Sequence, residues 1–215
     1  MLSQRVRGCR GNKCAVEPEG RRCILIAANV ADPDLCDDAV GRPVVGLGGL
    51  DILVNNAAFQ EHAGRIEDLS AIHFDQTIKT NLYGYFNMAK AAIPHMKPGS
   101  AIVMTGSVTG FLGSKDLLDY SMTKGGIHSF TRSLAAHLVD RQIRVNAVAP
   151  GPVWTPLNPA DKSAQRVAKF GSDTPMGRPA QPEEIAPAFV FLAAPSCSSY
   201  ITGEILPIVG GYSGG

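Results

Sequence analysis

Tyr120 and Lys124 are four residues apart at the start of a helical pattern, a spacing that puts both side chains on one face of a helix. A tyrosine phenol titrates at about 10, and we expect the nearby ammonium group to favour the phenolate and lower the pKa of Tyr120. Ser107 follows the apolar run 101–104, so its hydroxyl would lie at the carboxyl end of a buried strand. These three groups could move a proton to or from an alcohol while a hydride leaves or reaches its carbon.

Tyrosine and lysine at this spacing are also common on amphipathic helices, where the lysine simply reaches solvent. The wider pattern therefore decides the interpretation. Short apolar runs alternate with helical patterns, which is typical of a parallel sheet covered by helices on both faces. The expected strands are 23–27, 51–54, 101–105, 143–148 and 204–209, and the expected helices are 32–47, 71–95, 119–139 and one that opens at 181–184.

Two residues indicate where the first predicted helix begins. Asp32 is a suitable N-cap, and Pro33 suits the first helical position. Pro43 should kink or shorten that helix. Before residue 23 the sequence is basic and glycine-rich with little periodicity, so we expect an irregular tail over residues 1–22 and one domain over residues 23–215.

The composition of the sequence argues against several classes of function. Of 215 residues, 45% are hydrophobic and 18% charged, with a net charge of +1, which allows a sizeable core and indicates no nucleic-acid partner. No apolar run approaches the ~20 residues of a membrane span, and no signal segment opens the chain, so we expect a cytoplasmic protein without a membrane partner. The five scattered cysteines fit a reducing compartment, and no Cys or His spacing predicts a metal site.

Several motifs occur in one order along the predicted elements. They are Asn55-Asn56-Ala57-Ala58 after a strand, Asn81 inside the next helix, Ser107 after the following strand, Tyr120-x-x-x-Lys124, and Pro150-Gly151-Pro152-Val153-Trp154-Thr155 after the next strand. Over roughly residues 17–211 this order resembles the classical short-chain dehydrogenase/reductase family. The sequence around these motifs is most similar to that of bacterial members related to glucose or ribitol dehydrogenases and to general-stress oxidoreductases.

The resemblance implies a Rossmann-like α/β fold, with a doubly wound parallel sheet in three layers. It also implies an oxidoreductase that transfers a hydride between a nicotinamide cofactor, NAD or NADP, and a small alcohol or carbonyl substrate. Members of the family are commonly homotetramers or homodimers, so a homo-oligomer is expected.

The resemblance also assigns roles to four catalytic residues. Tyr120 would be the general acid and base, and Lys124 would lower its pKa and hold the hydroxyls of the nicotinamide ribose. Ser107 would orient and polarise the substrate oxygen. Asn81 would anchor a water that links Lys124 to solvent. Each role agrees with the chemistry of the residue type.

A further set is implied to contact the cofactor. Asn55 and Ala57 would line its ribose side, and Asn29 and Val30 occupy the place where the family usually has Asp-Val beside the adenine. The residues that would pass beside the nicotinamide, with Thr155 able to meet its amide, are Pro150, Gly151, Val153 and Thr155.

The sequence departs from the family at its beginning. The expected strand-Thr-Gly-x-x-x-Gly-x-Gly-helix segment, which holds the cofactor pyrophosphate, is missing. Gly8-x-x-Gly11 and Gly46-x-Gly48-Gly49 are interpreted as turns. We therefore expect an N-terminally truncated sheet with an exposed apolar edge and weakened cofactor binding. The alternative function is a catalytically weak member that serves as a binding or oligomer-assembly partner through the helices around Asn81 and Phe130.

Overall fold

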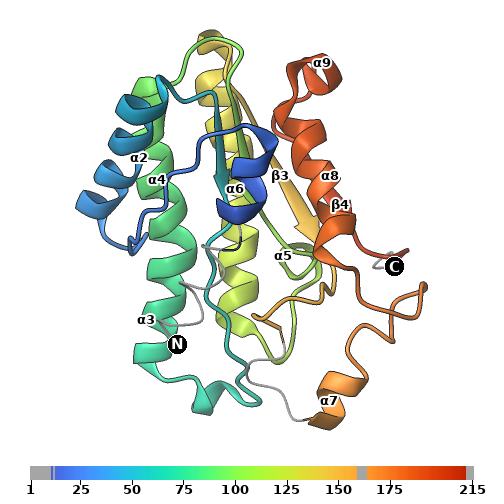
Figure 1. Ribbon diagram of the computed structural model, residues 1–215. Coiled ribbons are helices and arrows are strands. Elements are labelled where there is room, and N and C mark those ends of the chain that lie inside the picture. The colour runs from blue at the N-terminus through green and yellow to red at the C-terminus, as the bar shows by residue number, and fades with distance from the viewer. Residues whose placement is uncertain (1–10, 12, 159–163, 212–215) are drawn as a thin grey trace.

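The computed structural model describes residue 11 and residues 13–158 and 164–211, and its centre is a parallel sheet (Figure 1). In the described residues the sheet has four strands in the order β1-β2-β3-β4. Each pairs in parallel with its neighbour, and the strands are β1 (Ile52–Asn55), β2 (Ala101–Thr105), β3 (Arg144–Pro150) and β4 (Ile205–Ile208). Four of the five predicted strands are thus confirmed.

Helices cover both faces of this sheet. On one face lie α4 (Gly84–Ala92) and α6 (Leu118–Leu138), with α2 (Pro33–Leu47) packed against α4. On the other face lies α8 (Pro182–Ala193), and Figure 1 shows α2 and α4 to one side of the sheet and α8 to the other. Side chains alternate along β2, so that Ile102 packs in the hydrophobic cluster on the face of α4 and α6, and Val103 packs in the cluster on the face of α8. The predicted three-layer α/β fold is confirmed.

Shorter elements complete the described chain. They are α3 (Ala71–Ile78), a π-helix (Lys79–Tyr83), α5 (Thr109–Leu112), α7 (Ala164–Ala168), α9 (Pro195–Ser198), and 3₁₀ turns at Glu17–Glu19, Ile66–Asp68, Ile93–His95 and Val139–Arg141. The π-helix joins α3 directly to α4, so the predicted long helix is one continuous stretch with a wider turn in its middle. Such turns are frequent at functional sites, and this one contains Asn81.

Helix α2 tests the two predictions made for its N-cap and for Pro43. The Asp32 side chain accepts hydrogen bonds from the backbone N–H groups of Asp34 and Leu35, which confirms it as the N-cap. Of the expected kink or shortening at Pro43, the shortening is wrong, because α2 runs on to Leu47. Packing explains this, since the core contacts of Val40 and Val44 flank the proline and offset the loss of one backbone hydrogen bond.

The strand predicted at 23–27 is also wrong, because these residues have no regular structure. Ile24 and Leu25 are 37% and 39% exposed. A strand needs a neighbouring strand to satisfy its backbone groups, and in the described part of the chain none lies beside this run. The segment is instead tied to the end of α2, where the Arg22 guanidinium donates to the carbonyl of Gly46 at 2.7 Å.

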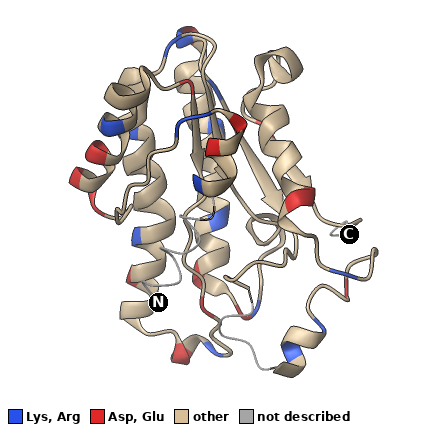
Figure 2. Cartoon of the chain, viewed as in Figure 1, with Lys and Arg blue, Asp and Glu red and all other residues tan. Residues whose placement is uncertain are grey.

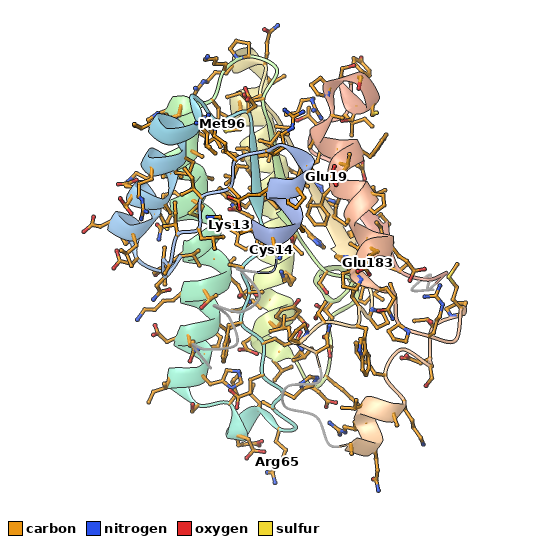
Figure 3. The ribbon with its side chains drawn as sticks, viewed as in Figure 1. Lys13, Cys14, Glu19, Arg65, Met96 and Glu183 are labelled. Atoms are coloured by element: carbon orange, nitrogen blue, oxygen red, sulfur yellow. The ribbon has the colours of Figure 1, made fainter. Side chains whose placement is uncertain are left out.

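The expected irregular tail is partly helical where the structure describes it, and residues 20–22 have no helix. Residues 13–16 are helical and lead into the turn Glu17–Glu19, where Lys13 and Glu17 form an ion pair at 3.5 Å. Figure 3 labels Lys13, Cys14 and Glu19 on this segment. Residues 1–10 and 12, and with them Gly8, lie outside the described residues.

Charged residues of both signs are spread over the helices and loops (Figure 2). No helix among the described residues combines the length and the apolar character that crossing a membrane would require. The exposed apolar edge expected of the sheet is found at β1, where Ile52 and Val54 are 47% and 46% exposed.

Candidate active site

A cavity of about 1260 Å³ opens at the carboxyl ends of the strands. This edge is where parallel α/β sheets bind their ligands. Ser107, Tyr120 and Lys124 line the cavity, together with residues that follow β1 and β3 and residues of α7 and α8. The fold therefore brings the three sequence-predicted groups into one cavity.

Tyr120 and Lys124 lie on successive turns of α6, as their spacing predicts. Both side chains are buried, and Lys124 is fully so. The Lys124 ammonium donates a hydrogen bond to the Thr105 carbonyl at 2.6 Å and lies 5.3 Å from the centroid of the Tyr120 ring. A second ring, that of Tyr85, has its centroid 5.5 Å from the same nitrogen. Two aromatic faces thus help to hold the buried cation.

Burial dominates the protonation of this pair. It raises the pKa of Tyr120 to about 12, against a lowering by the neighbouring Ser107 hydroxyl. Burial also lowers the pKa of Lys124 to about 7. The expectation that Lys124 lowers the pKa of Tyr120 is therefore wrong for the chain alone, because the lysine loses its charge before the phenol titrates. Between these two pKa values both groups are neutral.

The loop that carries Ser107 is held by the strands beneath it. The backbone N–H groups of Gly106 and Val108 donate to the carbonyls of Val148 and Pro150 at 2.7 Å and 2.9 Å. The Ser107 side-chain oxygen accepts a hydrogen bond from the Thr109 N–H at 3.2 Å. The Ser107 hydroxyl therefore sits on a loop that is fixed at both ends, beside Tyr120.

His128 supports this loop and was missed by the sequence reasoning. Its Nε2 accepts a hydrogen bond from the Ser107 N–H at 3.4 Å, and burial, with the charges of Arg132 and Lys124, lowers its pKa to about 4. A Cβ atom at Gly110 would lie 2.6 Å from the imidazole, so the loop needs glycine there. The available signal was helical spacing, because His128 is one turn beyond Lys124 on the same face.

Asn81 is fully buried in the π-helix and links three segments. Its side chain accepts from the Phe59 N–H at 2.8 Å and donates to the Phe59 carbonyl and to the Thr123 hydroxyl, both at 3.0 Å. Thr123 directly precedes Lys124. The Asn81 amide therefore ties the chain after β1 to the helix that carries the cavity's lysine, and it does not itself line the cavity.

The predicted cofactor residues at the end of β3 and after it line the cavity, and these are Pro150, Gly151, Val153 and Thr155. At the end of β1 and just after it, the lining includes Asn56 and Ala58 but neither Asn55 nor Ala57. Asn55 is 4% exposed, and its amide donates to the Tyr85 carbonyl at 3.1 Å. Alternation along the extended chain explains this, because neighbouring side chains point in opposite directions.

Asn29 and Val30 lie between α2 and α4, away from the lining of the cavity. The Asn29 side chain accepts from the Ala31 N–H at 3.1 Å, which closes a local turn before α2. The Val30 carbonyl accepts from the Asn87 amide at 3.3 Å. In the described structure both residues support the start of α2.

The residues of the cavity fit the ribose end of a nicotinamide cofactor. Among the described residues, Thr105 supplies the one hydrogen-bond acceptor for Lys124, whose nitrogen has further N–H donors at the cavity. Buried donors without acceptors suit ribose hydroxyls, and Gly151 allows close approach of a ring. Within residues 13–158 and 164–211, no group of His, Cys, Asp or Glu could hold a metal ion.

Comparison with known proteins gives relatives over nearly the whole chain. A family model described as enoyl-(acyl carrier protein) reductase matches residues 8–213. General stress protein 39 of Bacillus subtilis is 50% identical over 199 residues, which are 93% of this chain and 69% of that protein. Glucose and ribitol dehydrogenase homolog 2 of Arabidopsis thaliana is 47% identical over 193 residues, which are 90% of this chain and 66% of that protein.

Solved structures agree with these relatives. A short chain dehydrogenase from Burkholderia cenocepacia, solved in complex with NADP, superposes with a TM-score of 0.86 at 33% identity. The match covers 94% of this chain and 81% of that one. A dehydrogenase/reductase from Sinorhizobium meliloti also gives 0.86, at 30% identity, over 94% of this chain and 79% of the other.

Proposed function

The chain belongs to the short-chain dehydrogenase/reductase family and is an oxidoreductase that uses NAD or NADP, and we propose that Tyr120 is its general acid and base. The observation that carries this proposal is the convergence of Ser107, Tyr120 and Lys124 in one cavity at the carboxyl edge of the sheet. The alternative role as a catalytically weak assembly partner is not favoured, because such a role would not require this buried arrangement.

The protonation states support carbonyl reduction at neutral pH. With a pKa of about 12, Tyr120 holds its proton and can donate it to a substrate oxygen that gains negative charge. The Ser107 hydroxyl, beside the phenol, orients that oxygen. A bound nicotinamide cofactor supplies the hydride when a carbonyl is reduced and accepts it when an alcohol is oxidised. Lys124 keeps the phenol in place and offers its remaining N–H donors to ribose hydroxyls.

The cofactor would contact the lining of the cavity. Lys124 and the run after β3, from Pro150 to Thr155, would hold the nicotinamide riboside. On the ribose side Asn56 and Ala58 replace Asn55 and Ala57 in the proposal, because they line the cavity. A small alcohol or carbonyl compound is the proposed substrate.

The test is oxidation of NADPH and of NADH with a panel of small aldehydes and aldoses. We expect turnover by the wild-type chain and a loss of about 10³-fold in Tyr120→Phe, since the phenol hydroxyl alone passes the proton. Circular dichroism serves as the folding control, with an unchanged spectrum expected. Turnover of Tyr120→Phe within about threefold of wild type would exclude Tyr120 as the acid.

We also propose a homodimer or homotetramer in the cytoplasm. The scattered cysteines support the compartment. Three apolar side chains, Tyr83, Phe86 and Met122, are each more than half exposed on the π-helix, α4 and α6. Exposed apolar side chains on neighbouring helices favour self-association. Light scattering after size exclusion would measure the mass, and Phe86→Glu should lower it; a monomeric wild-type chain would refute the proposal.

A further inference from the structure

A buried carboxylate directly precedes the proposed catalytic tyrosine. Asp119 is 2% exposed and does not line the cavity. Its Oδ2 accepts a hydrogen bond from the Thr77 hydroxyl, and Nε2 of His73 lies 3.2 Å from the same oxygen. A buried carboxylate is costly unless it is hydrogen-bonded, so the Thr77 hydroxyl of α3 defines where Asp119 can lie.

This contact is one of two that join the same helices. Thr77 is one turn before Asn81, and Asp119 is one turn before Thr123. The pairs Thr77–Asp119 and Asn81–Thr123 therefore form two polar rungs between the α3–π-helix stretch and α6. The Asn81–Thr123 rung lies beside Lys124, and the Thr77–Asp119 rung lies beside Tyr120.

The Thr77–Asp119 rung lies where α6 needs support. The N-cap residue of α6, Leu117, makes no side-chain cap hydrogen bond, and Tyr120 is in the first turn of that helix. First turns have unpaired backbone N–H groups and open most easily. A carboxylate in the first turn also interacts favourably with the helix dipole. Asp119 is thus the side chain that fixes the turn carrying Tyr120 to a neighbouring helix.

We propose that Thr77 and Asp119 are positioning residues, which hold the Tyr120 hydroxyl beside Ser107 by anchoring the first turn of α6. His73 adds the second contact to the carboxylate, and its ring is held edge-on against Phe59 with centroids 5.7 Å apart. Neither Thr77 nor Asp119 touches the substrate. The inference rests on the proposed role of Tyr120.

A matched pair of substitutions separates positioning from stability. Thr77 and Thr131 are both fully buried, and each hydroxyl oxygen lies within hydrogen-bond distance of the carbonyl four residues earlier, at 3.1 Å and 2.8 Å. Of the two, Thr77 alone also reaches Asp119. We expect Thr77→Val to lower kcat by at least about tenfold, since small displacements of reacting groups are costly. The kcat of Thr131→Val should stay within about twofold of the wild-type value, and its melting temperature should be similar to that of the wild type.

The conservative variant Thr77→Ser gives the rescue. It keeps the hydroxyl that Asp119 accepts from, but it loses a buried methyl group and should melt earlier. We expect its kcat to stay within about threefold of wild type. An equal loss of kcat in Thr77→Ser and Thr77→Val, or in Thr131→Val and Thr77→Val, would overturn the proposal.

A second readout needs neither cofactor nor turnover. In the chain labelled with ¹³C-tyrosine, the Tyr120 resonance, assigned by its loss in Tyr120→Phe, should shift in Thr77→Val and stay in Thr131→Val. An unmoved Tyr120 resonance in Thr77→Val would overturn the anchor. A wild-type chain without turnover would contradict the proposed function, and the resonance would then decide the anchor by itself.

Discussion

β3 and β1 belong to one sheet but have different surroundings. β3 lies between β2 and β4, and six of its seven residues are buried. Among the described strands β1 has one neighbour, and its Ile52 and Val54 are about half exposed. Ser107 follows β2, and the run Pro150 to Thr155 begins at the last residue of β3. The loops of the proposed site therefore extend from the two enclosed strands, whereas Tyr120 and Lys124 lie on α6. Enclosed strands hold side chains rigidly, which is what proton transfer requires.

After Tyr120→Phe, the largest effect is expected from removing Lys124, the buried lysine of α6. Lys124→Ala should lower turnover by about 100-fold or more, because the phenol loses the group that keeps it in place. It should also weaken cofactor binding by at least about tenfold, since a buried hydrogen-bond donor to the ribose hydroxyls is lost. Initial rates and quenching of the reduced cofactor's fluorescence measure the two. Lost turnover with unchanged affinity would refute the shared role.

A smaller effect is expected on the pH dependence of stability. The folded-state pKa of Lys124, about 7, is below its ordinary value of 10.5, so between them the unfolded chain binds more protons. The free energy of unfolding should therefore rise with pH, by up to about 1.4 kcal/mol per unit. Above about pH 10 the raised pKa of Tyr120 reverses the sign, because the unfolded tyrosine loses its proton first.

The control for this pH dependence is Lys124→Met, which keeps most of the side-chain volume and removes the titrating group. Urea denaturation at pH 7, 8 and 9 would compare the two chains. The wild type should gain stability relative to Lys124→Met across this range. Parallel curves for the two chains would contradict burial as the cause of the lowered pKa of Lys124.

The smallest effect is expected at the β1 edge, where the sheet supplies its own matched pair. Val54 and Val103 are register partners in β1 and β2, with exposures of 46% and 0%. Val103→Thr buries a hydroxyl among apolar side chains and should cost about 1–3 kcal/mol. Val54→Thr should change stability by less than about 0.5 kcal/mol. Equal shifts of the two melting temperatures would contradict the contrast between the strands.

Sequence reasoning predicted the enclosed strands and the first turns of α6 well. The strand at 101–105 and the pair Tyr120 and Lys124 follow from local apolar runs and helical spacing. The strand expected at 23–27 was wrong because a strand depends on a neighbour that a local pattern does not reveal. The pKa of Tyr120 was wrong in direction because burial is a property of the folded chain.

The contacts of the supporting residues could not be found from local patterns, although helical spacing places His128 on the same face of α6 as Lys124. Thr77 meets Asp119 across 42 positions, and His128 meets Ser107 across 21. Both contacts depend on how helices and loops pack, and neither pair has a distinctive spacing. The cavity residue at the end of β1 could not be predicted either. Whether Asn55 or Asn56 lines the cavity depends on which face of the extended chain meets it.

The most direct test of the central claim follows the two transferred hydrogens separately. The chain is given propanal and reduced cofactor with deuterium at the transferable position, and the alcohol is analysed by mass spectrometry. We predict one deuterium on the former carbonyl carbon with the wild-type chain, and almost no alcohol with Tyr120→Phe. Alcohol without deuterium, or labelled alcohol formed equally fast by Tyr120→Phe, would contradict hydride transfer with Tyr120 as the proton donor.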